Sequence, residues 1–165
     1  MSQTRIRRLA LSGVLTALVF VVTAYLHIPT ANGYIHVGDG FIYLAACLLP
    51  LPYAIAVGSG GALLADLLTG YAIWAPGSVV IKALCAMLFF GRRRRVICPY
   101  SCLALLPAAA VTAGGYYLYE ALLYGNLIAP LAGIPASLLQ ASASAAVFVL
   151  LGLSVDRMRG NSKSR

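Results

Sequence analysis

The chain has 165 residues, of which 61% are hydrophobic and only 10% are charged, and its mean hydropathy is +0.89. This composition excludes an ordinary water-soluble domain, so we expect a single integral membrane domain over residues 1–165. The net charge of +8 would suggest a nucleic-acid partner in a soluble protein. Here the basic residues lie in short loops and tails beside apolar segments, so we expect no nucleic-acid partner and interpret the charge as a signal of membrane topology.

The first part of the chain predicts three membrane spans. The first covers about residues 6–26, and no small-residue cleavage site follows it, so we expect it to be retained. A loop rich in Pro, Gly and Asn occupies 27–38. Apolar sequence then covers 39–50 and 53–68, and Pro50-Leu51-Pro52 interrupts it because proline lacks a backbone donor. By hydropathy this region is either two helices or one broken segment, since a run as short as 39–50 does not cross a bilayer core of about 30 Å.

The second part predicts three more spans, at about 78–90, 102–123 and 136–155, followed by a polar tail. The basic residues decide the number of crossings, because Lys and Arg gather on the cytoplasmic side and an even number of crossings must separate two cytoplasmic clusters. Four crossings before the middle cluster and two after it satisfy this condition. The three clusters are Arg5, Arg7 and Arg8, then Arg92–Arg95, then Arg157, Arg159, Lys163 and Arg165.

The expected fold is therefore an all-α membrane protein with six transmembrane helices and both termini in the cytoplasm, located in the cell (cytoplasmic) membrane. The expected outer loops, near 27–38, 69–77 and 124–135, contain no Lys or Arg. The cluster Arg92–Arg95 is also expected to bind anionic headgroups, which makes membrane lipids a partner.

Five expected helices each carry one strongly polar side chain in the outer half of the membrane. A charged group at the bilayer centre costs about 2.5–3.5 kcal/mol on insertion scales, so such residues usually face the bundle interior and carry function. Their common depth indicates an outward-facing pocket. The five residues are Asp39, Asp66, Lys82, Glu120 and Gln140.

Aromatic and amide side chains lie at the same depth. Planar rings stack on aromatic side chains, while a few donors and acceptors fix the orientation of a ligand. We therefore expect the pocket to bind a small, polar, ring-shaped molecule. His27 is expected to be only an interfacial residue. The candidates for binding are Tyr34, His36, Tyr71, Trp74, Tyr116 and Asn126, with Tyr117 and Tyr119 nearby.

Several of these residues have a second, structural interpretation. Asp39 lies near an expected helix N-terminus, where capping and the helix dipole favour an acidic side chain. Lys82 and either Asp66 or Glu120 form a structural ion pair in the alternative interpretation. Trp74 and the outer tyrosines also fit an interfacial aromatic belt. The sequence leaves these alternatives open.

Two other classes of function are weaker. A small intramembrane enzyme would use Asp39, Asp66 and Glu120 as acids, bases or metal ligands, but the spans hold no second buried His or DxxxD-type cluster, so we expect no catalytic residue, metal or bound cofactor. A membrane scaffold would not need five polar residues at one depth. The segment Gly58-Ser59-Gly60-Gly61 lacks the Lys-Ser/Thr of a phosphate loop, so we expect no ATPase activity in this chain.

Three short blocks, together with Lys82, resemble a known family. Gly33-Tyr34-Ile35-His36-Val37-Gly38-Asp39, Ala65-Asp66-Leu67-Leu68-Thr69-Gly70-Tyr71, Trp74-Ala75-Pro76 and Lys82 occur in this order. The sequence resembles, over essentially its whole length, the substrate-binding S components of energy-coupling factor (ECF) vitamin transporters. The match is closest to the riboflavin-type branch, which is similar to S components for hydroxymethylpyrimidine and pyridoxine.

The resemblance implies an ECF-type ABC importer subunit that captures a vitamin or precursor from outside. It would work with a transmembrane coupling subunit and two cytoplasmic ATPases, which use the ATP. The family's small-residue patch on the first helix implies that Ala10, Gly13 and Ala17 contact the coupling subunit, with Gly13 departing from the usual alanine. The pocket favours a pyridoxine-like or hydroxymethylpyrimidine-like ring, and the isoalloxazine of riboflavin would stack as well.

Overall fold

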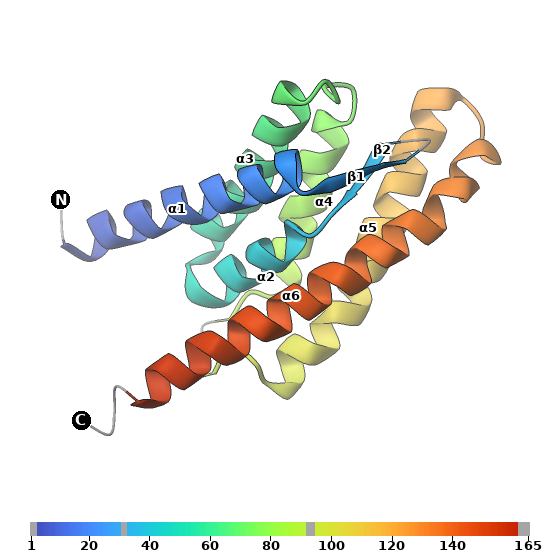
Figure 1. The fold of residues 1–165 in the computed structure, drawn as a ribbon. Helices are drawn as coiled ribbons and strands as arrows, with labels where there is room; N and C mark the ends of the chain where they lie inside the picture. Colours follow the sequence, from blue (N-terminus) through green and yellow to red (C-terminus); the bar gives the residue numbers. More distant parts are fainter. Residues whose placement is uncertain (1–2, 31–32, 92–94, 162–165) are drawn as a thin grey trace.

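The computed structural model describes residues 3–30, 33–91 and 95–161, and most of them are helical (Figure 1). This agrees with the expected all-α class. The elements in chain order are α1 (Gln3–Tyr25), β1 (His27–Thr30), β2 (Gly33–His36), α2 (Asp39–Leu48), α3 (Leu51–Leu68), α4 (Ala75–Leu88), α5 (Pro99–Tyr124), the 3-10 helix η1 (Ala129–Gly133) and α6 (Ile134–Asn161).

Four segments are long and apolar enough to cross a membrane, namely α1, α3, α5 and Ala129–Gly160, which combines η1 with α6. The other two helices are shorter, with 10 residues in α2 and 14 in α4. At 1.5 Å per residue they measure about 15 and 21 Å, less than the bilayer core of about 30 Å. The helices make this a multi-pass membrane protein, whereas six full crossings stay a prediction.

The break between α2 and α3 confirms that this region forms two helices. Leu49 has extended backbone angles, and Pro50 precedes the first turn of α3. Proline is tolerated at a helix start because the backbone donor it lacks would have no intrahelical partner there. The core is centred on α2, where Tyr43 stacks on Phe89 with ring centroids 4.3 Å apart. A Cβ at Gly40 would lie 2.8 Å from the backbone oxygen of Ser144, so glycine permits the close approach of α2 to α6.

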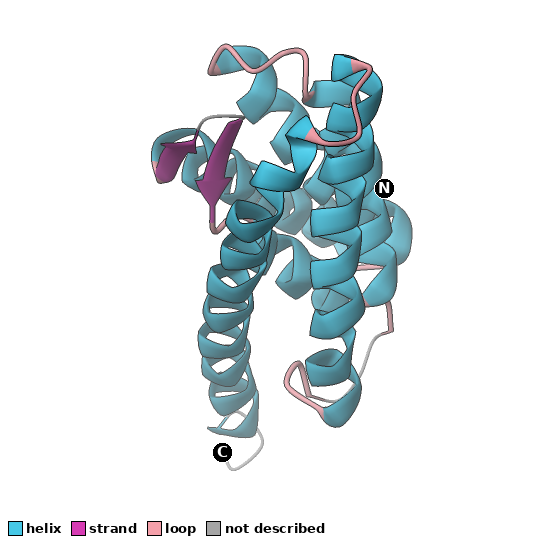
Figure 2. Cartoon of the chain, turned by 90° about the vertical axis from the view of Figure 1, so that its right-hand side faces the viewer, coloured by secondary structure: helices cyan, strands magenta, loops and turns pink. Residues whose placement is uncertain are grey.

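The loop expected at 27–38 contains an antiparallel hairpin, in which His27 of β1 faces His36 of β2. Strands of four residues are too short to show an alternating pattern that sequence reasoning would detect. The hairpin and the α5–α6 connection lie at one end of the bundle, while the start of α1 and the end of α6 lie toward the other (Figures 1 and 2). Residues Arg92–Arg94, Lys163 and Arg165, to which we assigned topological roles, lie outside the described residues.

Candidate functional site

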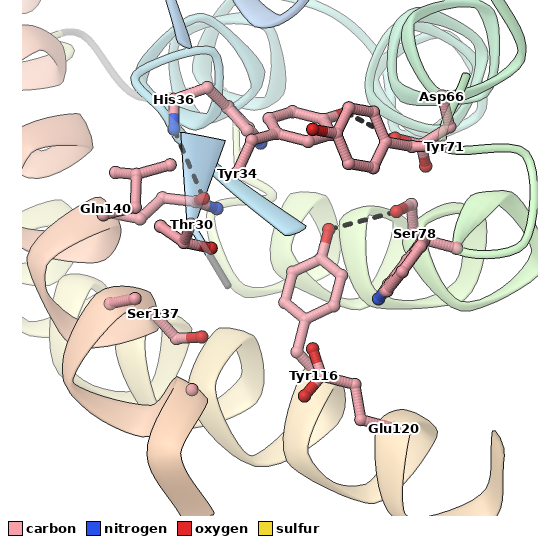
Figure 3. Close-up of a pocket in the computed structure, with 14 residues that line it drawn as sticks. Thr30, Tyr34, His36, Asp66, Tyr71, Ser78, Tyr116, Glu120, Ser137 and Gln140 are labelled. Carbon is pink, nitrogen blue, oxygen red and sulfur yellow. Dashed lines mark hydrogen bonds between the residues drawn. The ribbon is translucent and has the colours of Figure 1, made fainter. Parts of the chain in front are cut away.

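A cavity of about 60 Å³ lies between the hairpin and the neighbouring parts of α3, α4, α5 and α6 (Figure 3). Its lining combines aromatic rings, two carboxyl groups and several hydroxyl or amide groups. Most of the expected ligand-binding residues line it, which places them at one site; contact with a ligand stays a prediction. These are Tyr34, His36, Asp66, Tyr71, Trp74, Tyr116, Glu120 and Gln140.

Aromatic rings form one side of the cavity. The centroids of the Tyr34 and Tyr71 rings are 4.5 Å apart, and those of Tyr71 and Trp74 are 5.9 Å apart. The ring of His27, expected to be only interfacial, lies 5.0 Å from that of Tyr34 on the other strand of the hairpin. Rings at these separations present both faces and edges, which suits the stacking of a planar ligand.

Hydrogen bonds connect the cavity wall across elements. The hydroxyl of Tyr34 in β2 donates to Asp66 Oδ1 in α3, and burial together with the nearby Asp66 raises the pKa of Tyr34. The hydroxyls of Tyr116 and Ser78 are 3.1 Å apart and link α5 to α4 (Figure 3). Ser78 lies four residues before Lys82, on the same face of α4, so helical spacing from Lys82 would have pointed to it.

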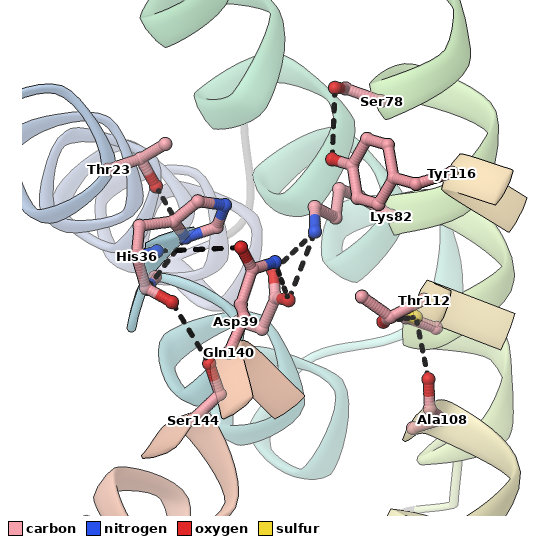
Figure 4. Close-up of polar contacts among 12 residues, drawn as sticks. Thr23, His36, Asp39, Ser78, Lys82, Ala108, Thr112, Tyr116, Gln140 and Ser144 are labelled. Carbon is pink, nitrogen blue, oxygen red and sulfur yellow. Dashed lines mark hydrogen bonds and ion pairs between the residues drawn. The ribbon is translucent and has the colours of Figure 1, made fainter. Parts of the chain in front are cut away.

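Beneath the cavity, Lys82 and Asp39 form a buried ion pair (Figure 4). Lys82 Nζ lies 2.8 Å from Asp39 Oδ1 and 3.0 Å from Oδ2, and the two side chains are 1% and 0% exposed. Gln140 Nε2 donates to Asp39 Oδ2 at 3.1 Å. Neither Lys82 nor Asp39 lines the cavity.

The ion pair also corrects one of our alternatives, because the partner of Lys82 is Asp39, and neither Asp66 nor Glu120. Asp39 does lie in the first turn of α2, but the N-cap residue is Gly38 and makes no side-chain cap. The carboxylate therefore neutralises Lys82 in addition to any favourable interaction with the helix dipole.

His36 connects the hairpin to two helices, α1 and α6. Its Nδ1 accepts a hydrogen bond from the backbone N–H of Gly38 at 3.1 Å and lies 3.5 Å from Thr23 Oγ1 of α1. Its backbone N–H donates to Gln140 Oε1, and Ser144 Oγ donates to its backbone oxygen (Figure 4). An Nδ1 that accepts is unprotonated, and burial lowers the pKa of His36 from 6.5 to about 4. The imidazole is therefore neutral at pH 7.

Some residues fall outside the cavity or were not anticipated. Asn126 is exposed in the α5–η1 connection, where its Oδ1 accepts from the backbone N–H of Ile128 at 2.7 Å. The cavity lining also includes Thr30 and Ser137, which no sequence pattern distinguishes from other hydroxyl residues. The expected coupling residues Ala10, Gly13 and Ala17 are exposed on α1.

These features define a class: a multi-pass, all-helical membrane protein with a small polar and aromatic cavity near one end of the bundle. A family model described as "ECF-type riboflavin transporter, S component" matches residues 3–157. The chain belongs to this family. No curated protein matches the chain. Membership makes it a vitamin-binding transport subunit of the cell membrane and not an enzyme with its own ATPase, so the intramembrane-enzyme alternative no longer applies.

Proposed function

We propose that this S component captures a water-soluble vitamin or precursor with a single heteroaromatic ring, of the pyridoxine or hydroxymethylpyrimidine type, from outside the cell. The observation that supports this proposal is the cavity, in which Tyr34 and Tyr71 offer stacking surfaces and Asp66 and Gln140 offer hydrogen bonds. Each water molecule needs roughly 12 Å³ of cavity volume, so the cavity of about 60 Å³ holds about five waters. A single ring needs much less widening than the three-ring isoalloxazine of riboflavin, which is the alternative ligand.

The orientation follows from charge. We place both termini in the cytoplasm because Arg5, Arg7 and Arg8 begin the chain and Arg157 and Arg159 lie near its end. The cavity, near the opposite end of the bundle, then opens to the outside. A transmembrane coupling subunit and two cytoplasmic ATPases would supply the energy for release inside.

Ligand capture is tested with the purified protein. The chain has a single tryptophan, Trp74, and it lines the cavity. We expect its fluorescence to change on titration with pyridoxine or hydroxymethylpyrimidine, with dissociation constants at or below the micromolar range, and mass spectrometry to find a ligand retained from the cell. Trp74→Phe, with binding followed by calorimetry, separates loss of signal from loss of binding. A protein that retains nothing and binds none of these vitamins, riboflavin included, would refute the proposal.

Coupling is tested separately on α1. A Cβ at Gly13 would meet nothing within 4 Å, so a larger side chain there leaves the fold of the subunit intact and projects outward. We expect Gly13→Leu to keep ligand affinity but to impair uptake into cells that express the coupling module, by obstructing close helix packing. Gly114→Leu on α5 is the matched control, since a Cβ there also meets nothing within 4 Å. Equal loss of uptake in both variants would contradict the assignment of this surface.

A further inference from the structure

The end of the bundle that holds the cavity carries a net negative charge. Three of the four acidic residues of the chain, Asp39, Asp66 and Glu120, lie in or just beneath the cavity wall, together with the single basic residue Lys82. Three carboxylates and one ammonium group give a formal charge of −2. Because Lys82 is paired with Asp39, the charges of Asp66 and Glu120 are the ones left uncompensated.

The Asp66 carboxylate is only partly hydrogen-bonded within the described part of the protein. The residue is 2% exposed, its Oδ1 accepts from Tyr34, and its Oδ2 is buried without a hydrogen-bond partner among the described residues. A buried carboxylate oxygen without a donor is unfavourable, so most such atoms in proteins have a partner. Since Asp66 lines the cavity, a ligand bound there would lie close to this carboxylate.

The remaining wall favours a cation over an anion. The described residues that line the cavity include no Lys or Arg, and His36 is neutral because its Nδ1 accepts from the Gly38 N–H. The faces of Tyr34, Tyr71 and the Trp74 indole carry negative electrostatic potential, which attracts positive charge. The described lining residues therefore offer no Lys or Arg to neutralise a phosphate or carboxylate group on a ligand.

We propose that the cavity selects a positively charged, amino-bearing nitrogen heterocycle, which donates an N–H to Asp66 Oδ2 and stacks on the tyrosine rings. It discriminates against uncharged analogues and against phosphorylated forms. This inference rests on the proposed capture of a vitamin-type ring and specifies the chemistry of the ring at the same site.

The test compares a cationic ligand with an uncharged analogue that has the same ring, using the unmodified full-length protein in detergent. The pair is pyridoxamine, whose aminomethyl group is protonated at pH 7, against pyridoxine, with pyridoxamine 5′-phosphate and riboflavin as further probes. We expect pyridoxamine to bind about tenfold more tightly than pyridoxine, as for hydrogen bonds to charged groups. The phosphorylated form should bind at least about tenfold more weakly than pyridoxamine.

A charge-removing variant locates the effect. Asp66→Asn keeps an oxygen that accepts from Tyr34 but removes the negative charge, so the preference for pyridoxamine over pyridoxine should fall to about threefold or less. Asp156→Asn is the matched control, because that carboxylate binds the backbone N–H groups of Val96 and Ile97 instead of lining the cavity. The ligand comparison needs no variant, so it holds even where Asp66→Asn fails to fold.

Each other outcome contradicts a defined statement. Tightest binding of riboflavin or of a phosphorylated ring would overturn the charge selectivity and leave vitamin capture intact. A preference for pyridoxamine that Asp66→Asn does not change would overturn the role of Asp66. Absence of binding by every probe would overturn vitamin capture itself, and with it this inference.

Discussion

Removal of the ammonium group of Lys82 should destabilise the fold far more than it disturbs the cavity. In the variant Lys82→Met, the Asp39 carboxylate would stay buried at 0% exposure with only Gln140 as a hydrogen-bonding partner. At the observed N–O distance of 2.8 Å and an effective dielectric constant of about 20, the lost attraction is about 6 kcal/mol. Removing one partner of a buried pair typically costs about 3–5 kcal/mol, and we expect a loss of this size.

The double variant Asp39→Asn/Lys82→Met separates charge burial from simple loss of contacts. Without the carboxylate no charge is left unpaired, and an amide oxygen still accepts from Gln140. Stability should therefore recover to within about 1.5 kcal/mol of the unmodified chain, because neutral replacement of a buried pair is often nearly neutral. The assay is unfolding in detergent, followed by far-ultraviolet circular dichroism and by Trp74 fluorescence.

Two results would refute this reasoning. A double variant as unstable as Lys82→Met alone would show that the pair contributes through packing and not through charge. A Lys82→Met protein of normal stability that binds ligand much more weakly would show that Lys82 contacts the ligand, as its sequence pattern first suggested. Neither result is compatible with a buried pair whose role is to support the cavity from below.

Three further changes have expected effects of known sign. Because the pKa of His36 is lowered from 6.5 to about 4, the unfolded chain binds more protons than the folded chain between these pH values. The free energy of unfolding should therefore fall by up to about 3 kcal/mol as the pH drops from 7 to 4. His36→Gln should flatten a plot of Tm against pH, and an unchanged slope would argue that His36 is not the origin of the pH dependence. Gly77→Ala should cost about 1–3 kcal/mol because a Cβ would lie 2.6 Å from the Tyr119 ring, whereas Gly114→Ala, with open space, should cost nothing in the same unfolding assay, and equal losses would contradict the packing argument. Asp156→Ala should cost about 1–3 kcal/mol by leaving without acceptors the two backbone N–H groups of Val96 and Ile97, which precede α5. Unchanged thermal unfolding would show that water replaces the carboxylate.

Sequence reasoning located many of the cavity residues because depth in a membrane is a one-dimensional property. Hydropathy sets where each helix begins, and so it sets which polar side chains share a level. Asp66, Glu120 and Gln140 were identified this way, and the structure places all three around one cavity. The same reasoning placed Asp39 and Lys82 at that level, although it did not reveal that they lie below the cavity and bind each other.

The sequence by itself determined that the chain lies in a membrane, that prolines divide the second and third helices, and to which family it belongs, because composition, proline chemistry and short motifs are local properties. Only the tertiary structure decided which side chains bind one another. Lys82 and Asp39 are 43 positions apart, and Gln140 and Asp39 are 101 apart. Which face of a helix meets which neighbour depends on the rotation and approach of whole helices. That is set by close packing, such as the contact that Gly40 allows between α2 and α6, and not by the pattern within any one helix.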